Sequence, residues 1–362
     1  MKIIVPANCV SEDKRIALAP EHVSSLIKLG FEVWFEQCDA PFPVSDYEAQ
    51  GGRWTCDKRQ LCSDATLILS IGAVSPDVLN LISSPVYVVG LLGGKRNAGL
   101  YGSRFLQAYA LELLPRISKA QFMDVLSSQA TLMGYWAITQ VATYLPKVLP
   151  MMTTAAGTLS PAQILVLGAG VAGLQAIGMG RRLGAKVSAC DVRLDTKEHV
   201  ESLGAKFLHL PGIQDAEHTG GYARALTPQE QKIQQEFLKT LLPSYDAIIC
   251  SALVPGTSAP LLLTHDMIAS CRPGTVIIDL ATHLGNSGNC EFTEPGKIIS
   301  FQNVTTVGAF YPLSALPVSA SLLYGKNLLA FINLIWNAKA QRWMLPEEDP
   351  LLEAMCISRF SQ

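Results

Sequence analysis

The sequence predicts an α/β protein made of two domains, each built on a parallel sheet and joined by long helices. At 362 residues, the chain is long enough for two domains with separate hydrophobic cores. Short apolar runs alternate with segments of helical periodicity, which is the pattern of parallel strands connected by helices. In addition, one segment, 161–193, has the order strand, glycine-rich turn, helix, strand.

Composition excludes several classes of protein. The net charge of −2 gives no reason to expect binding of nucleic acid or of an anionic membrane surface. The nine cysteines are scattered without CxxC spacing, and the six histidines show no metal-ligand spacing, so we expect a reducing compartment, no disulfide framework and no metal site. No uninterrupted apolar run reaches about 18 residues, so we expect no membrane-spanning helix.

The first domain is expected at residues 1–125, completed by residues 309–362. A helix over 20–29 begins with Pro20 and ends before Gly30, both common boundary residues. Its strands are predicted from apolar runs at Lys2–Val5, Glu32–Phe35, Ala65–Ser70, Val86–Leu92 and Gln107–Leu111. None of these strands is followed by a glycine motif.

A long helix over Gln121–Leu145 is expected to lead into the second domain, at residues 126–308, because apolar residues recur there at helical spacing. Near the end of the chain, Ser319–Trp336 has the period of an amphipathic helix, and we expect it to pack back on the first domain. Residues after Ala338 show no pattern and are expected to be peripheral, with Glu347–Asp349 in a solvated tail.

The glycine-rich segment predicts a dinucleotide site. Ile164–Leu167 is a strand candidate, and Gly168 permits the tight turn that follows it. Gly170 lets the backbone approach a pyrophosphate, and Gly173 lets the next helix pack closely on the sheet. That helix begins near Val171, and its N-terminal N–H groups can bind phosphate oxygens. Both domains are therefore expected to be Rossmann-like, and the second to bind the nucleotide.

The end of the next strand predicts which dinucleotide is bound. Asp191 follows the strand 187–190, where a carboxylate can accept hydrogen bonds from the adenosine ribose hydroxyls. It would repel a 2′-phosphate, which favours NAD(H) over NADP(H). Val192 and Arg193 are expected beside it, and the charge of Arg193 works against that preference.

The remaining strands of the second domain are predicted within 204–209, 247–251, 275–280 and 304–308. Because ligands bind at the carboxyl ends of such strands, Ala252–Gly256, with Ala252 and Leu253 as contacts, and Leu280–His283 are expected near the nucleotide. The polar stretch 214–235 contains Gly220-Gly221-Tyr222, which predicts a mobile loop with glycine hinges.

Several segments resemble proton-translocating NAD(P) transhydrogenases. The segment 116–129, Arg-Ile-Ser-Lys-Ala-Gln-Phe-Met-Asp-Val-Leu-Ser-Ser-Gln, is similar to the nicotinamide-side loop of that family. Further similar segments occur in order at Gly168–Ile177, Gly220–Ala223, Ala252–Gly256 with Ala259-Pro260, Asn289–Glu291 and Ser321–Leu328. Residues 2–335 are covered, and the portion of the enzyme that the chain resembles is the NAD(H)-binding domain I of the alpha subunit, in the form where it is a separate chain.

The resemblance implies roles for residues and partners. Arg116, Gln121 and Asp124 would be catalytic, Ser127 would help to hold the nicotinamide and its ribose, and Tyr222 would close a loop over NAD(H). NADP(H) would be bound on a partner subunit, and the chain would assemble as a homodimer with NADP(H)-binding and membrane-spanning subunits. It would be cytoplasmic, peripheral on the inner face of the cytoplasmic membrane. A hydride passes directly between two nicotinamides in this reaction, so the site must position them and needs no acid or base at that step.

Two alternatives stay open. Alanine dehydrogenases share the two-domain fold and use a Lys and a His in the first domain, but the matching stretches Leu69–Gly72 and Val88–Leu92 contain neither. The transhydrogenases also usually carry a lysine near the first stretch, so a non-catalytic NAD(H)-binding paralogue is the second alternative. Arg15 could bind a nucleotide or partner or form an ion pair, and His283 could serve the site or only its loop.

Overall fold

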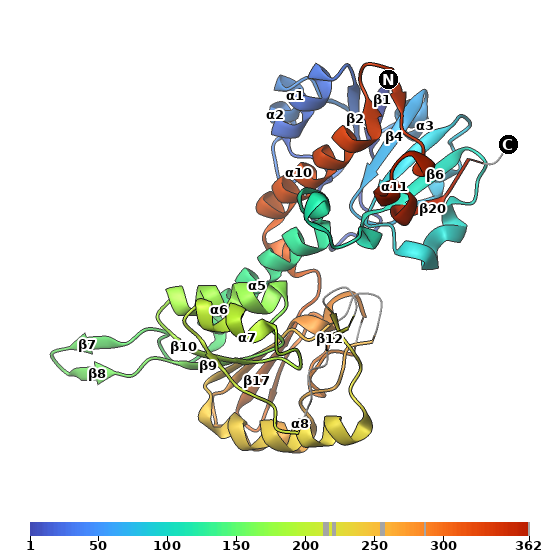
Figure 1. Cartoon of the computed structure of the whole chain (residues 1–362). Helices are drawn as coiled ribbons and strands as arrows, with labels where there is room; N and C mark the ends of the chain where they lie inside the picture. Colours follow the sequence, from blue (N-terminus) through green and yellow to red (C-terminus); the bar gives the residue numbers. More distant parts are fainter. Residues whose placement is uncertain (213–216, 219–221, 254–257, 286, 361–362) are drawn as a thin grey trace. The chain divides into compact units, whose positions relative to one another are not determined.

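A computed structural model describes residues 1–212, 217–218, 222–253, 258–285 and 287–360. The chain divides into two compact units, Met1–Gln129 with Leu313–Gln362 and Ala130–Pro312. Each unit contains a seven-stranded, mostly parallel sheet covered by helices (Figure 1). The predicted α/β class with two Rossmann-like folds is confirmed. The predicted domain boundaries, between residues 125 and 126 and between residues 308 and 309, stay a prediction.

The sheet of the first unit has the order β20-β6-β5-β4-β1-β2-β3, in which only β20 runs antiparallel to its neighbour. Its strands are β1 (Lys2–Val5), β2 (Glu32–Glu36), β3 (Arg53–Thr55), β4 (Ala65–Ser70), β5 (Val86–Gly90), β6 (Leu106–Ala110) and β20 (Cys356–Ser358). The five predicted strands all form. The edge strands β3 and β20 were not predicted, because each has only three residues.

The helices of the first unit are α1 (Pro20–Lys28), α2 (Val44–Ala49), α3 (Lys58–Cys62), α4 (Pro76–Leu79), α10 (Pro317–Ile335) and α11 (Pro350–Met355). Shorter 3-10 segments are η1 (Gly94–Tyr101), η2 (Leu111–Leu113), η3 (Ser118–Met123) and η7 (Pro346–Glu348), and a small hairpin pairs β18 (Trp336–Asn337) with β19 (Arg342–Trp343). In the described part of the chain, α10 alone is long and apolar enough to cross a membrane. Its apolar character has a structural cause, since Tyr324, Phe331 and Ile335 are fully buried in the core of this unit.

The C-terminal segment corrects the prediction that residues after Ala338 are peripheral. α11 buries Leu351, Leu352 and Met355 in the core, and β20 pairs with β6. The acidic residues are not a free tail either, since Asp349 caps α11 and Glu348 pairs with Arg342. These elements are too short to show a sequence period, and burial against distant residues stabilises them.

A buried histidine in α1 should make the first unit sensitive to acid. His22 is 2% exposed, its Nδ1 accepts the Ala19 N–H at 2.9 Å, and a Cβ at Gly325 of α10 would lie 2.2 Å from that nitrogen. Burial lowers the pKa of His22 to about 4, although Glu21 acts in the opposite direction. The imidazole is therefore neutral in the folded chain at pH 7.

Stability should fall as the pH drops from about 6.5, where an unfolded histidine takes up a proton, toward about 4. Between these two pH values the unfolded state binds the proton and the native state does not, so protonation stabilises only the unfolded state. The expected decrease in the free energy of unfolding is about 3 kcal/mol. Urea denaturation at pH 7 and pH 4.5 measures it. His22→Gln should reduce the pH dependence, whereas replacing the exposed His199 by Gln should not; equal pH dependence in both variants would contradict the assignment.

The sheet of the second unit has the order β11-β10-β9-β14-β15-β17-β16, with only β16 antiparallel. Its strands are β9 (Gln163–Leu167), β10 (Lys186–Cys190), β11 (Lys206–Phe207), β14 (Ala247–Cys250), β15 (Val276–Asp279), β16 (Ile298–Phe301) and β17 (Val304–Gly308). Its helices are α6 (Val171–Arg182), α7 (Thr196–Ser202), α8 (Pro228–Leu241) and α9 (His265–Ile268), with 3-10 segments η4 (Leu242–Ser244) and η5 (Leu280–Gly285). A further 3-10 segment, η6 (Pro312–Ala315), begins at the last residue of this unit and continues into the first.

Three features of this unit differ from the prediction. The long helix α5 (Val125–Tyr144) begins later than expected because η3 precedes it. α8 occupies part of the predicted polar stretch, and its first turn has a capping box between Thr227 and Glu230. The run before β9 forms a hairpin of β7 (Met152–Thr154) and β8 (Gly157–Leu159), which projects from the unit (Figure 1).

Candidate functional site

The turn between β9 and α6 has the geometry that its glycines predict. Gly168 has a φ of +95°, which other residues rarely adopt. A Cβ at Gly173 would lie 2.0 Å from the carbonyl oxygen of Gly168, so the helix can pack this closely on the strand only with glycine there. The fold itself therefore requires glycine at positions 168 and 173, whether or not a ligand binds.

Gly170 is different, because its backbone leaves space open. It has a φ of −75°, and a Cβ added to it would meet no described atom within 4 Å. No side chain in the described residues caps α6, whose first backbone amides follow at Val171. An open backbone beside a helix N-terminus fits a phosphate-bearing ligand, since the N–H groups and the helix dipole both favour an anion.

Asp191 reaches this turn from the end of β10. Its Oδ2 accepts the Ala169 N–H at 2.7 Å, and its Oδ1 accepts the Arg193 N–H at 2.9 Å. The Arg193 side chain binds the same carboxylate through Nε at 3.0 Å and Nη2 at 2.9 Å. The side chains are 7% and 13% exposed, so Asp191 and Arg193 form a largely buried pair. Val192 and Ala252 are partly buried and pack against the same apolar cluster, which includes Leu167 and Cys190.

A network of hydrogen bonds holds the segment after β14. Its central residues, Asn289 and Asp279, were not predicted to be part of the site. Asn289 accepts the Ala252 N–H at 3.1 Å and donates to the Ala252 carbonyl at 2.8 Å. Asn289 is held in turn by Asp279, which is fully buried at the end of β15 and accepts the N–H groups of Asn289, Cys290 and Ala281 and the hydroxyl of Thr293. Burial raises the pKa of Asp279, and these hydrogen bonds oppose that shift. The available signal in the sequence was a carboxylate at the end of an apolar strand.

In the first unit, Asp124 and Ser127 lie together at the start of α5. Asp124 accepts the Ser127 N–H at 2.9 Å and its hydroxyl at 2.6 Å, which is the geometry of a helix cap. Arg116 lies two residues before η3 and Gln121 lies within it, and both residues are exposed. The backbone of this segment is held by Asn327 of α10, which donates to the Phe122 carbonyl at 2.8 Å.

Other predicted residues are placed only partially. The backbone of Tyr222 lies in β13 (Tyr222–Ala223), paired with β12 (Glu217–His218), but its side chain lies outside the described residues. The same holds for the side chain of His283, and Gly220, Gly221 and Gly256 lie outside entirely. Leu253 is described and half-buried beside Ala252.

The side chain of Arg15 is held by hydrogen bonds to Asp13 and Gln129. Its guanidinium forms two hydrogen bonds with Asp13, at 2.8 and 2.6 Å, and a third with Gln129 at 2.8 Å. Both members of the ion pair are 8% exposed. The ion-pair interpretation of Arg15 therefore has direct support in its contacts.

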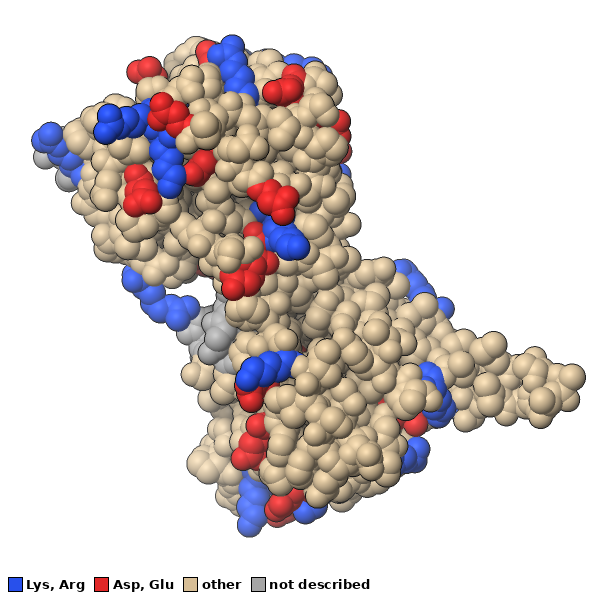
Figure 2. All heavy atoms as spheres, turned by 180° about the vertical axis from the view of Figure 1, so that it is seen from behind, with Lys and Arg blue, Asp and Glu red and all other residues tan. Residues whose placement is uncertain are grey.

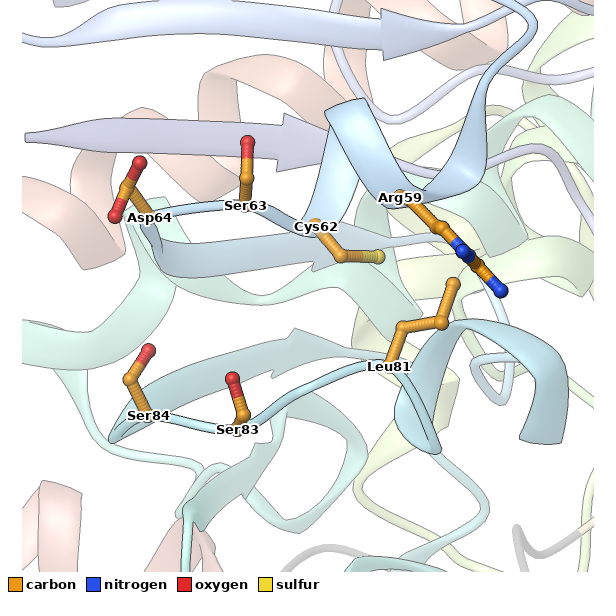
Figure 3. A pocket seen from close by; sticks show the side chains of 7 residues that line it. All are labelled: Arg59, Cys62, Ser63, Asp64, Leu81, Ser83 and Ser84. Atoms are coloured by element: carbon orange, nitrogen blue, oxygen red, sulfur yellow. The ribbon is translucent and has the colours of Figure 1, made fainter.

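A separate pocket of about 370 Å³ lies in the first unit (Figure 3). It is lined by Arg59, Cys62, Ser63, Asp64, Leu81, Ser83 and Ser84. None of the residues predicted from the sequence lines it. The pocket therefore gives no support to the predicted dinucleotide site.

Two sequence families match most of the chain. The family described as "Alanine dehydrogenase/PNT, N-terminal domain" matches residues 4–133, and "Alanine dehydrogenase/PNT, C-terminal domain" matches residues 137–361. A Rhodospirillum rubrum protein, named as the first portion of the alpha subunit of NAD(P) transhydrogenase, is 39% identical, covering 99% of this chain and 96% of the relative. The protein of the same name from Rickettsia prowazekii is 40% identical, with 99% and 95% covered.

Solved structures agree with these matches. The transhydrogenase of Sinorhizobium meliloti superposes with a TM-score of 0.81 at 34% identity, covering 99% of this chain and 97% of that one. An L-alanine dehydrogenase gives a TM-score of 0.76 at 20% identity, with 98% and 94% covered, which shows likeness of fold. The resemblance inferred from the sequence is confirmed, and the chain belongs to the alanine dehydrogenase/PNT family.

Proposed function

We propose that this chain is the NAD(H)-binding component of a proton-translocating NAD(P) transhydrogenase, in which a hydride passes from NADH to NADP⁺ on a partner subunit. The observation that carries the proposal is the identity of 39–40%, over nearly the full chain, to proteins named as the first portion of the transhydrogenase alpha subunit. The open backbone at Gly170 supports it independently, because it provides room for a pyrophosphate.

The residues proposed to bind NAD(H) form two groups, one in each unit, and we take the units to be two domains, 1–125 with 309–362 and 126–308. The turn Gly168–Gly173 holds the pyrophosphate, with Val171 at the helix N-terminus, while Asp191, Val192 and Arg193 surround the adenosine. Ala252 and Leu253 line the same ligand, and Tyr222 closes over it. The reduced nicotinamide supplies the hydride when it is bound. Arg116, Gln121, Asp124 and Ser127 hold the nicotinamide and its ribose in the reacting geometry.

The chemistry of these side chains suits positioning. A direct hydride transfer needs the two reacting carbons held about 3–3.5 Å apart and requires no proton transfer to a substrate at that step. The Asp124 carboxylate is already oriented by Ser127, so it is a fixed acceptor. An amino-acid dehydrogenase would also need a cation for the substrate carboxylate, and the charge of Arg15 is neutralised by Asp13.

The partners follow from the proposed reaction. NADP(H) is bound on another subunit, and membrane-spanning subunits couple the reaction to proton movement. The chain is then cytoplasmic and peripheral on the inner face of the cytoplasmic membrane. We also propose a homodimer, which the hairpin β7–β8 supports.

The hairpin is exposed and apolar in a way that suggests a covered surface. Met151, Met152 and Leu159 are 65%, 44% and 53% exposed. Residues 151–160 contain no Lys, Arg, Asp or Glu, and Figure 2 shows the projecting arm without charged side chains. A hairpin of two strands is barely stable alone in water, so burial against a second copy would stabilise it.

Replacing Met152 and Leu159 by Asp should therefore convert a dimer into a monomer, because burying two carboxylates in an apolar interface is unfavourable. Sedimentation equilibrium measures the mass. Leu203→Asp, at an exposed apolar residue elsewhere in this unit, is the control and should leave the dimer intact. A wild-type monomer, or an unchanged dimer in the double variant, would contradict the hairpin interface.

The experiment that tests the function mixes the chain with an NADP(H)-binding partner domain and follows hydride transfer from NADH to an NADP⁺ analogue. Gln121→Ala should slow transfer by about 100-fold while changing NADH affinity only a few-fold, since loss of positioning acts mainly on the reacting geometry. Gln50→Ala, at an exposed glutamine of the same unit, is the control.

The outcomes separate the alternatives. Hydride transfer that depends on the partner supports the transhydrogenase. Formation of NADH from alanine by the chain alone would instead identify an amino-acid dehydrogenase. Binding of NADH without any transfer in the presence of a competent partner would identify a non-catalytic paralogue.

A further inference from the structure

The carboxylate of Asp191 is saturated with donors. An ionised carboxylate has about four lone-pair positions, and four hydrogen bonds occupy them here. Two donors are backbone N–H groups, of Ala169 and Arg193, and two belong to the guanidinium of Arg193. A ribose hydroxyl can be accepted by this carboxylate only if one of these donors leaves.

The donors differ in how easily they can leave. The Ala169 N–H belongs to the turn between Gly168 and Gly170, whose backbone is constrained by the close packing of α6 on β9. The Arg193 N–H forms a local turn with Asp191, two residues earlier. The guanidinium stands at the end of a flexible side chain, so rotation about its side-chain bonds frees the carboxylate without moving the backbone.

The same pair affects the response to a 2′-phosphate. Asp191 alone would repel that group, but the guanidinium within 3.0 Å neutralises its charge. A displaced guanidinium would remain near the ribose and could bind phosphate oxygens, for which its planar fork is well suited. Arg193 therefore acts against Asp191 in the choice between the two dinucleotides.

We propose that Arg193 sets dinucleotide selectivity by competing with the adenosine ribose for Asp191. This inference rests on the proposed function, and it concerns a nicotinamide dinucleotide with a free 2′-hydroxyl against one with a 2′-phosphate. In the nucleotide-free chain the guanidinium covers the carboxylate. It swings away when the ribose enters and weakens discrimination against the phosphorylated form.

Fluorescence titration of the full chain with NADH and with NADPH tests the proposal. The wild type should prefer NADH. Arg193→Met keeps the length of the stem and removes the charge and the donors, so it should raise the ratio of the NADPH to the NADH dissociation constant by about tenfold, the effect of one charged hydrogen-bonding group. Arg182→Met, at an exposed arginine in the last turn of α6, should leave the ratio unchanged.

Two further variants keep the test decisive if Arg193→Met unfolds. Arg193→Lys retains the charge without the fork and should raise the ratio less. Asp191→Asn removes the carboxylate charge that binds the guanidinium and repels a 2′-phosphate, so NADPH should bind more tightly and the ratio should fall. An equal change in affinity for both dinucleotides in the folded variants would overturn the role of Arg193. A wild-type chain that binds neither dinucleotide would instead overturn the proposed function.

Discussion

Gly173→Ala should destabilise the second unit by about 2–4 kcal/mol, the range of severe overpacking, and weaken NADH binding by more than about tenfold. The added methyl group would lie 2.0 Å from the Gly168 carbonyl oxygen and 2.9 Å from the Ser251 hydroxyl. The first contact is with backbone, so no side-chain rotation relieves it, and α6 must move away from β9. That movement displaces the helix N-terminus from the turn that is proposed to bind the pyrophosphate.

Two glycines of the same segment separate folding from binding. At Gly178 a methyl group would meet, among the described residues, only Leu203, at 3.7 Å, so Gly178→Ala should be neutral or should stabilise by up to about 1 kcal/mol through helix propensity. At Gly170 a methyl group meets no described atom, so Gly170→Ala should fold normally and still lose NADH affinity by about tenfold, as expected from overpacking against a ligand. Urea denaturation and NADH fluorescence measure the two properties, and unimpaired binding by Gly170→Ala would place the pyrophosphate elsewhere.

Asp279→Ala should cost about 4 kcal/mol of stability and weaken NADH binding. The carboxylate is 0% exposed and accepts four hydrogen bonds, at 2.8–2.9 Å, from three backbone amides and the Thr293 hydroxyl. Without it the three backbone amides are buried without partners, each at a cost of about 1–3 kcal/mol, reduced where water enters the space. The Thr293 hydroxyl still has the Cys290 carbonyl as an acceptor at 2.7 Å. Because Asn289 holds both backbone polar groups of Ala252, the loop at the proposed site should lose order as well.

The matched control is Asp266→Ala, at an exposed carboxylate in the first turn of α9, which should cost only a few tenths of a kcal/mol, the typical value for an acid at a helix N-terminus. Denaturant titration gives both free energies of unfolding. If Asp279→Ala were as stable as this control, the network would not be what holds the loop. Retained stability with lost binding would place the role of Asp279 in the ligand contact itself.

Of the elements that were not predicted, α8 has a recognisable signal in the sequence and β20 has none. α8 carries Thr227, Pro228 and Glu230 in the order of a capping box, so its start was readable within the polar stretch. β20 was not readable, since three residues show no period and their partners are remote. The hydroxyl of Ser358, for example, donates to the Tyr101 carbonyl, 257 positions earlier.

The candidate site divides in the same way. The spacing of Gly168, Gly170 and Gly173 predicted the turn, because local backbone geometry demands these residues wherever a strand turns sharply into a closely packed helix. The spacing did not predict that the guanidinium of Arg193 binds Asp191, since an acid and an arginine two positions apart can pair or point to opposite sides. Nor did it predict that Asp279 supports Asn289 and, through it, Ala252.

The sequence by itself determined the α/β class, the parallel strands and the glycine turn, because the period of apolar residues and the conformational freedom of glycine are local properties of the chain. Only the tertiary structure decided the donors around Asp191, the buried network of Asp279 and the place of the C-terminal strand. These depend on which strand ends are adjacent in the sheet, and hydrogen bonds among buried groups follow from that adjacency rather than from spacing along the chain.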